Sequence, residues 1–400
     1  MTAVQTTSVR SQKRGGEAPA PKEKKQGKKL KNASDFLIVF LTLVLVVIGL
    51  VMVYDSSYYV AQQSSEFNND AAYFLKKQLY GAVAGATLMI IFTIMDYRIW
   101  RKFVLPLLIA ALVLMVLVWV PGIGININGS NRWIKIGPLP SIQSSEPAKF
   151  ALIVYLAHLF TLRRKEMGSF TRTILPALGV TGVFAALLYK QPNLSMLITY
   201  IAVMGIMMWQ AGAKWQHLLL MVGIGVGAVA IGWLFLPHVR DRLTGFLNPE
   251  ADPLDTGYQI LQSLYAIADG GWAGVGFGNS RQKFLYLPYR ETDFIFSIFA
   301  EEFGFFGCIG LLLLYWLLIW RCVLVTIRCP ERFGRLLAGG ITAMLAVQVI
   351  INVLVVTGSM PPTGLPLPFI SSGGSSLTIF LAEIGIMLNI SRSSGTHKRA

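Results

Sequence analysis

The sequence predicts an all-α membrane protein with about ten transmembrane helices, and three observations lead to that fold class. The 400 residues are 54% hydrophobic and only 14% charged, whereas soluble domains carry about 25% charged residues. Apolar runs long enough to cross a bilayer recur along the chain. Lys and Arg are also divided unequally between alternate connections, which is typical of membrane topology.

Seven apolar runs contain no Asp, Glu, Lys or Arg, and each is interpreted as a span: 36–54, 79–95, 103–120, 173–189, 195–210, 217–236 and 336–357. Three further apolar segments contain charged residues: 148–162 with Lys149, 294–320 with Glu301 and Glu302, and 376–391 with Glu383. Ionisable residues inside spans are costly and mark candidate functional positions. Together these segments give ten spans, with a long outer loop, 237–293, between the seventh and the eighth.

The positive charges predict the orientation. Ten spans place both termini on one side, and that side holds 24 of the 35 Lys and Arg residues against 11 on the other. Because such residues accumulate on the cytoplasmic side, both termini are predicted to be cytoplasmic, in the inner membrane. Residues 1–35 are predicted to be a disordered basic tail, 36–392 the membrane domain, and 393–400 a cytoplasmic C-terminal tail. Basic residues beside a membrane more often track anionic lipid than nucleic acid, so no nucleic-acid partner is expected.

Several classes of function receive no support from the sequence. The three cysteines have no metal-binding spacing, and the four histidines are scattered. The chain also lacks a Walker A motif and the nucleophile elbow of serine hydrolases. A zinc enzyme, an ATP-driven pump and a serine hydrolase are therefore not indicated.

The outer segment 358–375 is rich in proline and ends in glycine and serine. Its four prolines remove amide donors, so it is not a regular helix. It is nevertheless too apolar for open water, which favours a re-entrant loop facing a water-filled cavity. An ordinary tight surface connection is the alternative.

Asp293 lies where the long outer loop meets the apolar segment 294–320. An acid at a helix N-terminus is explained structurally as a cap, although Thr292 would cap equally well. The density of acids beside hydrocarbon, with Glu291, Glu301 and Glu302 close in sequence, favours a functional site instead.

Glu146 and Lys149 form an i, i+3 pair at the outer start of the fourth span, with Pro147 in the first turn. A lysine in the first turn opposes the helix dipole, so it needs another partner or an anionic ligand. Snorkelling of Lys149 to the interface is the alternative.

Arg132 follows a polar turn and suits either a phosphate or the carbonyl groups of a loop. Lys190 and Gln191 add a cation and an amide at a sharp outer turn. Five glycines between 270 and 278 would let backbone amides approach an anion, but they form no nucleotide-binding fingerprint.

These residues belong to a pattern that resembles the SEDS family (shape, elongation, division and sporulation) from the first span to about Arg392. The matching motifs are Asn-Arg-Trp-Ile at 131–134, Ser-Glu-Pro-Ala-Lys at 145–149, Gln-Pro-Asn-Leu at 191–194, Gly-Tyr-Gln at 257–259, Leu-Pro at 287–288, Thr-Asp-Phe-Ile-Phe at 292–296, Ala-Glu-Glu at 300–302, Pro-Leu-Pro-Phe at 366–369 and Ser-Gly-Gly-Ser-Ser at 372–376. Val-Thr-Gly at 356–358, the run 363–368 and the basic tail resemble the FtsW and SpoVE branch more than RodA. The chain departs from the usual family pattern at 289–291 and at 372, where Ser372 stands in place of a tyrosine.

The resemblance implies a peptidoglycan glycosyltransferase that polymerises lipid II on the outer leaflet during cell division or sporulation. Asp293 would be the general base, as its position at the aqueous edge suits. Arg132 and Lys149 would stabilise the departing pyrophosphate, with Glu146 orienting Lys149. Further candidate substrate-binding residues are Lys190, Gln191, Ser372, Gly373 and Gly374. No cofactor is certain; a divalent cation, Mg²⁺ or Mn²⁺, between the Asp293 carboxylate and phosphate is a candidate.

The resemblance also implies a class B penicillin-binding protein and other division proteins as partners, at the septum. The alternatives are a lipid II flippase, a non-catalytic scaffold and a RodA-type elongation polymerase. Transporters usually place charges near the bilayer midplane in repeated halves. Here the charges gather at the outer ends and no internal repeat is visible, which favours the enzyme.

Overall fold

The computed structural model describes residues 34–127, 130–135, 137, 141–235, 237–250 and 257–394. Most of the predicted N-terminal tail and of the last residues therefore lies outside the described residues. The helices are α1 Phe36–Gln63, α2 Tyr73–Ile94, α3 Val104–Leu117, α4 Ser145–Leu162, α5 Leu175–Lys190, α6 Leu194–Ala211, α7 Trp215–Phe235, α8 Pro237–Leu247, α9 Tyr258–Gly270, α10 Ile295–Arg328, α11 Arg332–Val356 and α12 Gly374–Ser394.

The structure confirms an all-α membrane fold. Within the described residues, eight helices are long and apolar enough to cross a membrane: α1, α2, α5 with the π-helical turn before it, α6, α7, α10, α11 and α12. α3 has only 14 residues, and α4 carries Glu146 and Lys149 near its start. With these two, a helix stands at each of the ten predicted segments. The number of ten crossings and the cytoplasmic orientation remain predictions.

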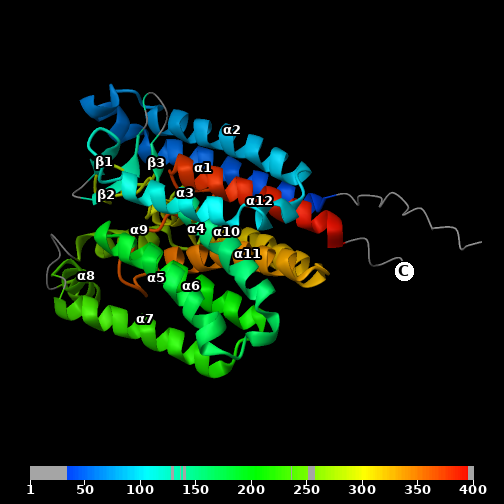
Figure 1. Cartoon of the computed structure of the whole chain (residues 1–400). Coiled ribbons are helices and arrows are strands. Elements are labelled where there is room, and N and C mark those ends of the chain that lie inside the picture. The colour runs from blue at the N-terminus through cyan, green and yellow to red at the C-terminus, as the bar shows by residue number, and fades with distance from the viewer. Residues whose placement is uncertain are drawn as a thin grey trace, which may run out of the picture.

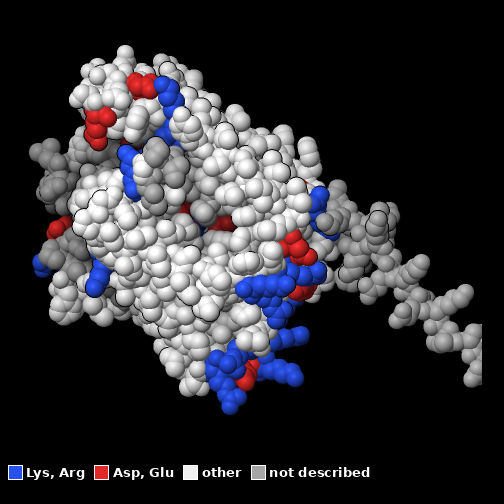
Figure 2. All heavy atoms as spheres, turned by 45° about the horizontal axis from the view of Figure 1, so that its top comes forward, with Lys and Arg blue, Asp and Glu red and all other residues white. Residues whose placement is uncertain are grey.

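The helices form one elongated bundle whose two ends differ (Figure 1). α1 begins and α12 ends at the same end of the bundle, where the Asp35 amide donates to Ser391 Oγ at 3.2 Å. This is the arrangement that an even number of crossings requires. A broad face of the molecule between the ends is largely without charged side chains, apart from acidic and basic atoms visible in a central hollow, and Lys and Arg gather toward the ends (Figure 2). Such an apolar belt is what a bilayer needs.

α12 lies along α2, because α2 presents glycines to it. A Cβ atom at Gly81 would lie 2.5 Å from Gly374 Cα, and one at Gly85 would lie 2.7 Å from the Leu381 side chain. α11 is the most buried span and packs against α4, α6 and α10, whereas α7 lies at the edge of the bundle. The buried face of α11 therefore lines the region between these helices in which the candidate site lies.

The outer end contains a small antiparallel sheet that the sequence analysis did not predict. Its strands are β1 Gly124–Ile127, β2 Ser130–Ile134 and β3 Ile142–Gln143, in the order β1-β2-β3. Alternating Ile and Asn residues before an Asn-Gly pair were the signal, since Asn-Gly favours hairpin turns. The sheet holds Arg132 beside the start of α4, because β2 pairs with β3 and β3 leads into that helix.

The proline-rich segment 358–373 is irregular and buried in protein rather than exposed. Leu365, Leu367, Phe369 and Ile370 are all at most 2% exposed. Its carbonyl groups accept hydrogen bonds from neighbouring helices, including one from Tyr315 to Pro368. A tight surface connection, the alternative interpretation, is therefore wrong.

α10 is broken at Gly304, where φ is +64°. The residues on either side of the break bond to the segment that follows α9: the Val275 and Gly276 amides donate to the carbonyls of Glu301 and Glu302. A Cβ atom at Gly274 or Gly304 would collide with this backbone. Close packing thus explains these glycines without an anion.

Candidate functional site

The pair Glu146 and Lys149 is fully buried at the start of α4. Lys149 Nζ lies 2.7 Å from Glu146 Oε2, and both side chains are 0% exposed. The predicted i, i+3 pairing is present, and snorkelling of Lys149 to the membrane surface is wrong. Burial of an ammonium at this depth is costly unless it is paired, so the carboxylate accounts for its presence.

Lys149 points inward between three helices. Its ammonium donates to Gln348 Oε1 of α11 at 3.3 Å and lies 3.5 Å from the ring centroid of Phe380 on α12. Tyr200 of α6 closes the site by donating to the Ser145 carbonyl at 2.8 Å. Glu383 of α12 interacts electrostatically with both members of the pair. The cation is thereby fixed in a poorly solvated enclosure.

Arg132 reaches the turn between α5 and α6. Its guanidinium donates to the carbonyls of Gln191 and Pro192. The Gln191 side chain is buried and donates to the Met115 carbonyl at 2.9 Å. Arg132 therefore satisfies loop carbonyls, as one of its two interpretations held, and phosphate binding by Arg132 remains a prediction.

Asp293 lies partly buried beside the proline-rich segment. Asn352 of α11 donates one hydrogen bond to the Asp293 carbonyl and another to the Leu365 carbonyl, both at 2.8 Å. Ser371 Oγ donates to the Thr292 carbonyl at 2.6 Å. The N-cap residue of α10 is Phe294, which forms no side-chain cap, so the interpretation of Asp293 or Thr292 as the N-cap is wrong. The N-cap lies one residue after Asp293 and two residues after Thr292, so the helix begins later than predicted.

One face of α11 connects the two candidate regions. Gln348 contacts Lys149, and Asn352 holds the backbone of Asp293. Residues four apart in a helix lie one above the other on the same face. The structure thus places the backbone of the Asp293 segment one helical turn along α11 from Gln348, the residue that binds the Lys149 ammonium.

The remaining predicted residues differ in their surroundings. The Ser372 amide donates to the Glu291 carbonyl at 2.8 Å, and the Gly373 amide donates to Gln78 Oε1 at 2.9 Å. Gly374 starts α12 against α2. Lys190 is exposed at the end of α5 and takes part in none of these bonds. Substrate binding by these residues, and by Gln191, remains a prediction.

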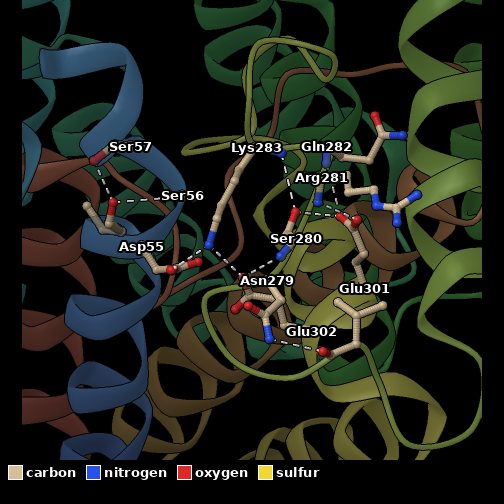
Figure 3. A network of polar contacts seen from close by, with 12 residues as sticks. Asp55, Ser56, Ser57, Asn279, Ser280, Arg281, Gln282, Lys283, Glu301 and Glu302 are labelled. Atoms are coloured by element: carbon tan, nitrogen blue, oxygen red, sulfur yellow. Dashed lines mark hydrogen bonds and ion pairs between the residues drawn. The ribbon is translucent and has the colours of Figure 1, made fainter. Parts of the chain in front are cut away.

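Sequence analysis missed a second buried charged group, the Lys283 network (Figure 3). Lys283 Nζ lies 2.8 Å from Asp55 Oδ1 on α1 and 2.9 Å from Glu302 Oε1 on α10. The Glu301 carboxylate accepts the Ser280 hydroxyl and the Arg281 and Gln282 amides. Two signals were available: the Glu301 and Glu302 pair, which the sequence analysis noted without finding its partners, and Asp55, a single acid in a long apolar helix.

The pKa values of Lys283 and Glu291, in the loop before α10, are shifted from their ordinary values. Burial opposes the charge of the Lys283 ammonium, but its bonds to Asp55 and Glu302 outweigh that penalty and raise the pKa of Lys283. Burial also raises the pKa of Glu291, against smaller opposing effects of a backbone hydrogen bond and Arg290. The segment that leads to Asp293 is therefore poorly solvated.

The described residues contain no group of three or more His, Cys, Asp or Glu side chains placed to hold a metal ion. Mg²⁺ is commonly held by one or two carboxylates together with substrate phosphates. Asp293 would supply one such carboxylate. The Mg²⁺ or Mn²⁺ candidate therefore depends on the substrate's own phosphates and remains a prediction.

This arrangement defines a multi-pass helical membrane protein with a charged site enclosed between its spans and its irregular outer segments. The family model of the cell cycle proteins FtsW, RodA and SpoVE matches residues 35–396. The chain belongs to this family, which confirms the resemblance found in its motifs.

Relatives and solved structures agree with that membership. The chain is 42% identical to stage V sporulation protein E of Bacillus subtilis, over 91% of this chain and 98% of that protein. It is 39% identical to a probable peptidoglycan glycosyltransferase FtsW of Trichlorobacter lovleyi, over 89% and 93%. A chain of a peptidoglycan synthase complex that coordinates polymerization and crosslinking superposes with a TM-score of 0.74 at 33% identity, over 91% and 99%. The rod shape determining protein RodA of Thermus thermophilus gives 0.67 at 30%, over 91% and 98%.

Proposed function

We propose that this protein is a peptidoglycan glycosyltransferase that polymerises lipid II into glycan strands at the outer face of the cytoplasmic membrane, in cell division or sporulation. Relatives that carry the name peptidoglycan glycosyltransferase support the reaction class. The structural observation that supports the proposal is that Gln348 and Asn352, on neighbouring turns of α11, contact the Lys149 ammonium and the Asp293 backbone respectively.

In the proposed reaction, a hydroxyl oxygen of the acceptor sugar attacks the anomeric carbon of the donor. The bond from that carbon to the pyrophosphate oxygen breaks, and undecaprenyl diphosphate leaves with the bonding electrons. Asp293 accepts the proton of the attacking hydroxyl as general base. A base at a partly buried position suits this task, because poor solvation of the carboxylate makes it a better proton acceptor.

Negative charge grows on the leaving pyrophosphate as the bond breaks. Lys149 supplies a fixed positive charge in a poorly solvated enclosure, where electrostatic stabilisation is strong. Glu146 holds that ammonium in place from one turn earlier on the same helix. Arg132 is anchored to the turn after α5 and adds a second cation at the outer end. These groups need no reorganisation during the reaction.

The expected partner is a class B penicillin-binding protein that crosslinks the strands, with other division proteins at the septum. The similarity to a chain of a peptidoglycan synthase complex supports such an assembly. Lipid II would enter sideways from the bilayer, because its undecaprenyl tail remains in hydrocarbon while its sugars reach the outer end.

The test is polymerisation of labelled lipid II by the purified protein, with its partner present. Asp293→Asn is expected to lower the polymerisation rate at least about 100-fold, the typical contribution of a general base. Asp269→Asn is the matched control, because Asp269 is an exposed acid of α9 and its loss is expected to leave the rate unchanged.

Two outcomes would contradict the proposal. Full activity of Asp293→Asn would exclude Asp293 as the base. Translocation of lipid II by the native protein without any polymer would favour the flippase instead. Measuring polymer and translocation on the same proteoliposomes separates these results.

A further inference from the structure

Glu383 is a buried acid without a bonded partner in the middle of α12. Its side chain is 1% exposed, and neither carboxyl oxygen has a hydrogen-bond partner in the described part of the chain. Burial of an ionised carboxylate without donors is expensive. The mechanism described above does not use this residue, so its presence beside Lys149 requires an explanation.

The charged and titratable groups that face Glu383 come from two helices. α4 supplies Glu146 and Lys149, and α6 supplies Tyr200, all of which interact electrostatically with it or with one another. The site therefore holds two carboxyl groups and a single ammonium. If both carboxyl groups were ionised, the enclosure would carry one net negative charge.

The other elements packed against α12 add no charge near Glu383. α11 contributes the neutral Gln348, and the buried face of α2 contributes only glycines, Gln78 and Met89. On α10, Tyr315 donates its hydroxyl to the Pro368 carbonyl. The turn Tyr97–Arg101 meets α12 at Asn389, toward the opposite end, and β3 is uncharged.

We propose that Glu383 is a positioning residue for Lys149, which keeps a proton while Lys149 is paired with Glu146 and thereby preserves the positive charge that the diphosphate group of the substrate meets. When Glu383 loses that proton, a second carboxylate stands beside Lys149. Its negative charge opposes the approach of an anion. This inference rests on the proposed function, since it concerns how the same site receives a diphosphate.

The first test compares the pH dependence of the apparent KM for lipid II in the wild type and in Glu383→Gln. Glutamine has the shape of the neutral acid but does not ionise. The wild-type KM is expected to rise about tenfold as the pH is raised into the alkaline range, the order expected for one added charge in a poorly solvated site. The KM of Glu383→Gln is expected to stay level while kcat near neutral pH remains that of the wild type.

The matched control is Glu66→Gln, which removes an exposed outer acid outside the bundle. It is expected to reproduce the wild-type pH profile. The same profile in Glu383→Gln as in the wild type would overturn the inference. A strongly destabilised Glu383→Gln would also overturn it, because an amide replaces a neutral carboxyl group without adding or removing charge.

A second test does not depend on turnover. Infrared spectroscopy of the purified protein detects the C=O stretch of protonated carboxyl groups. A band present in the wild type and in Glu66→Gln near neutral pH is expected to be missing from Glu383→Gln. If the wild type and Glu383→Gln have identical carboxyl bands, Glu383 is ionised and the inference fails, whether or not the protein polymerises lipid II.

Discussion

Two buried groups of charged side chains lie in the same bundle and differ in how completely they are bonded. In the Lys283 network (Figure 3), the Glu301 carboxylate accepts three hydrogen bonds, and Lys283 bridges one oxygen each of Asp55 and Glu302. The second oxygens of Asp55 and Glu302 have no hydrogen-bond partner among the described residues, but every acid of this network has at least one bonded partner. Around Lys149, Glu146 is held by the ammonium alone, and Glu383 has no bonded partner among the described residues.

The difference predicts a structural role for the Lys283 network and a functional one for the group around Lys149. A carboxylate that accepts several backbone amides fixes the position of a loop, because moving it would leave buried donors unsatisfied. An acid or cation with unfilled bonding capacity retains the ability to respond to a ligand. Burial alone, which both groups share, does not distinguish these roles.

The largest expected effect is on activity, at Lys149. Lys149→Met is expected to lower lipid II polymerisation at least about 100-fold, because it removes an electrostatic stabiliser of the leaving group. Lys102→Met is the control, since Lys102 is exposed and lies in none of the candidate sites, and little change is expected. The assay is polymer formation per folded molecule. If Lys149→Met retained wild-type activity, the two charged groups would no longer differ in function.

Lys283→Met is expected to affect stability instead. Its removal leaves Asp55 and Glu302 buried without their cation, and breaking such a pair costs about 3–5 kcal/mol. A denaturant titration of the detergent-solubilised protein measures this decrease in the free energy of unfolding. Activity per folded molecule should change little. A stable but inactive Lys283→Met would assign the network to catalysis and overturn the comparison.

Glu301→Gln sharpens the contrast with Glu383→Gln. In the first variant an amide nitrogen would replace a carboxylate oxygen that accepts from Ser280 or from a loop amide, at a cost of about 1–3 kcal/mol in unfolding free energy. The change at position 383 should cost less than about 0.5 kcal/mol, because no hydrogen bond is lost there. Equal losses in the two variants would show that bonding does not separate the groups.

The smallest effect is expected at Glu291, where burial raises the pKa. An acid whose pKa is raised on folding contributes stability that is complete below its unfolded value of about 4.3 and is lost as the pH rises through the folded value. Above that window, Glu291→Gln should be slightly more stable than the wild type, and below it the two should be equal. Melting temperatures measured across this pH range would reveal the crossover, and parallel curves would refute it.

Local patterns predicted much of this molecule. Each apolar run became a helix, and the spacing of Glu146 and Lys149 predicted their ion pair correctly. The proline-rich segment was correctly expected to be irregular and not an exposed surface connection, and the water-filled cavity that it was expected to face remains a prediction. In each case the relevant partner lies within one or two helical turns, or composition alone decides the outcome.

Contacts between distant segments could not be predicted from such local patterns. Asp55 and Lys283 are separated by 228 positions, and nothing in either segment indicates the other. Glu383 was visible only as an acid inside an apolar run, because its position beside Lys149 depends on how α12 packs against α4. The break at Gly304 could not be predicted either, since one glycine in a long apolar run does not indicate a positive φ.

That break has a mechanical consequence for the end of α10 that leads to Asp293. Backbone hydrogen bonds fasten α10 to the segment after α9 on both sides of Gly304, from the Val275 and Gly276 amides before the break and from the Phe305 and Phe306 amides after it. A change in the tilt of α10 would therefore carry the segment after α9 along with it. The two segments act as one mechanical unit beneath the loop that precedes Asp293.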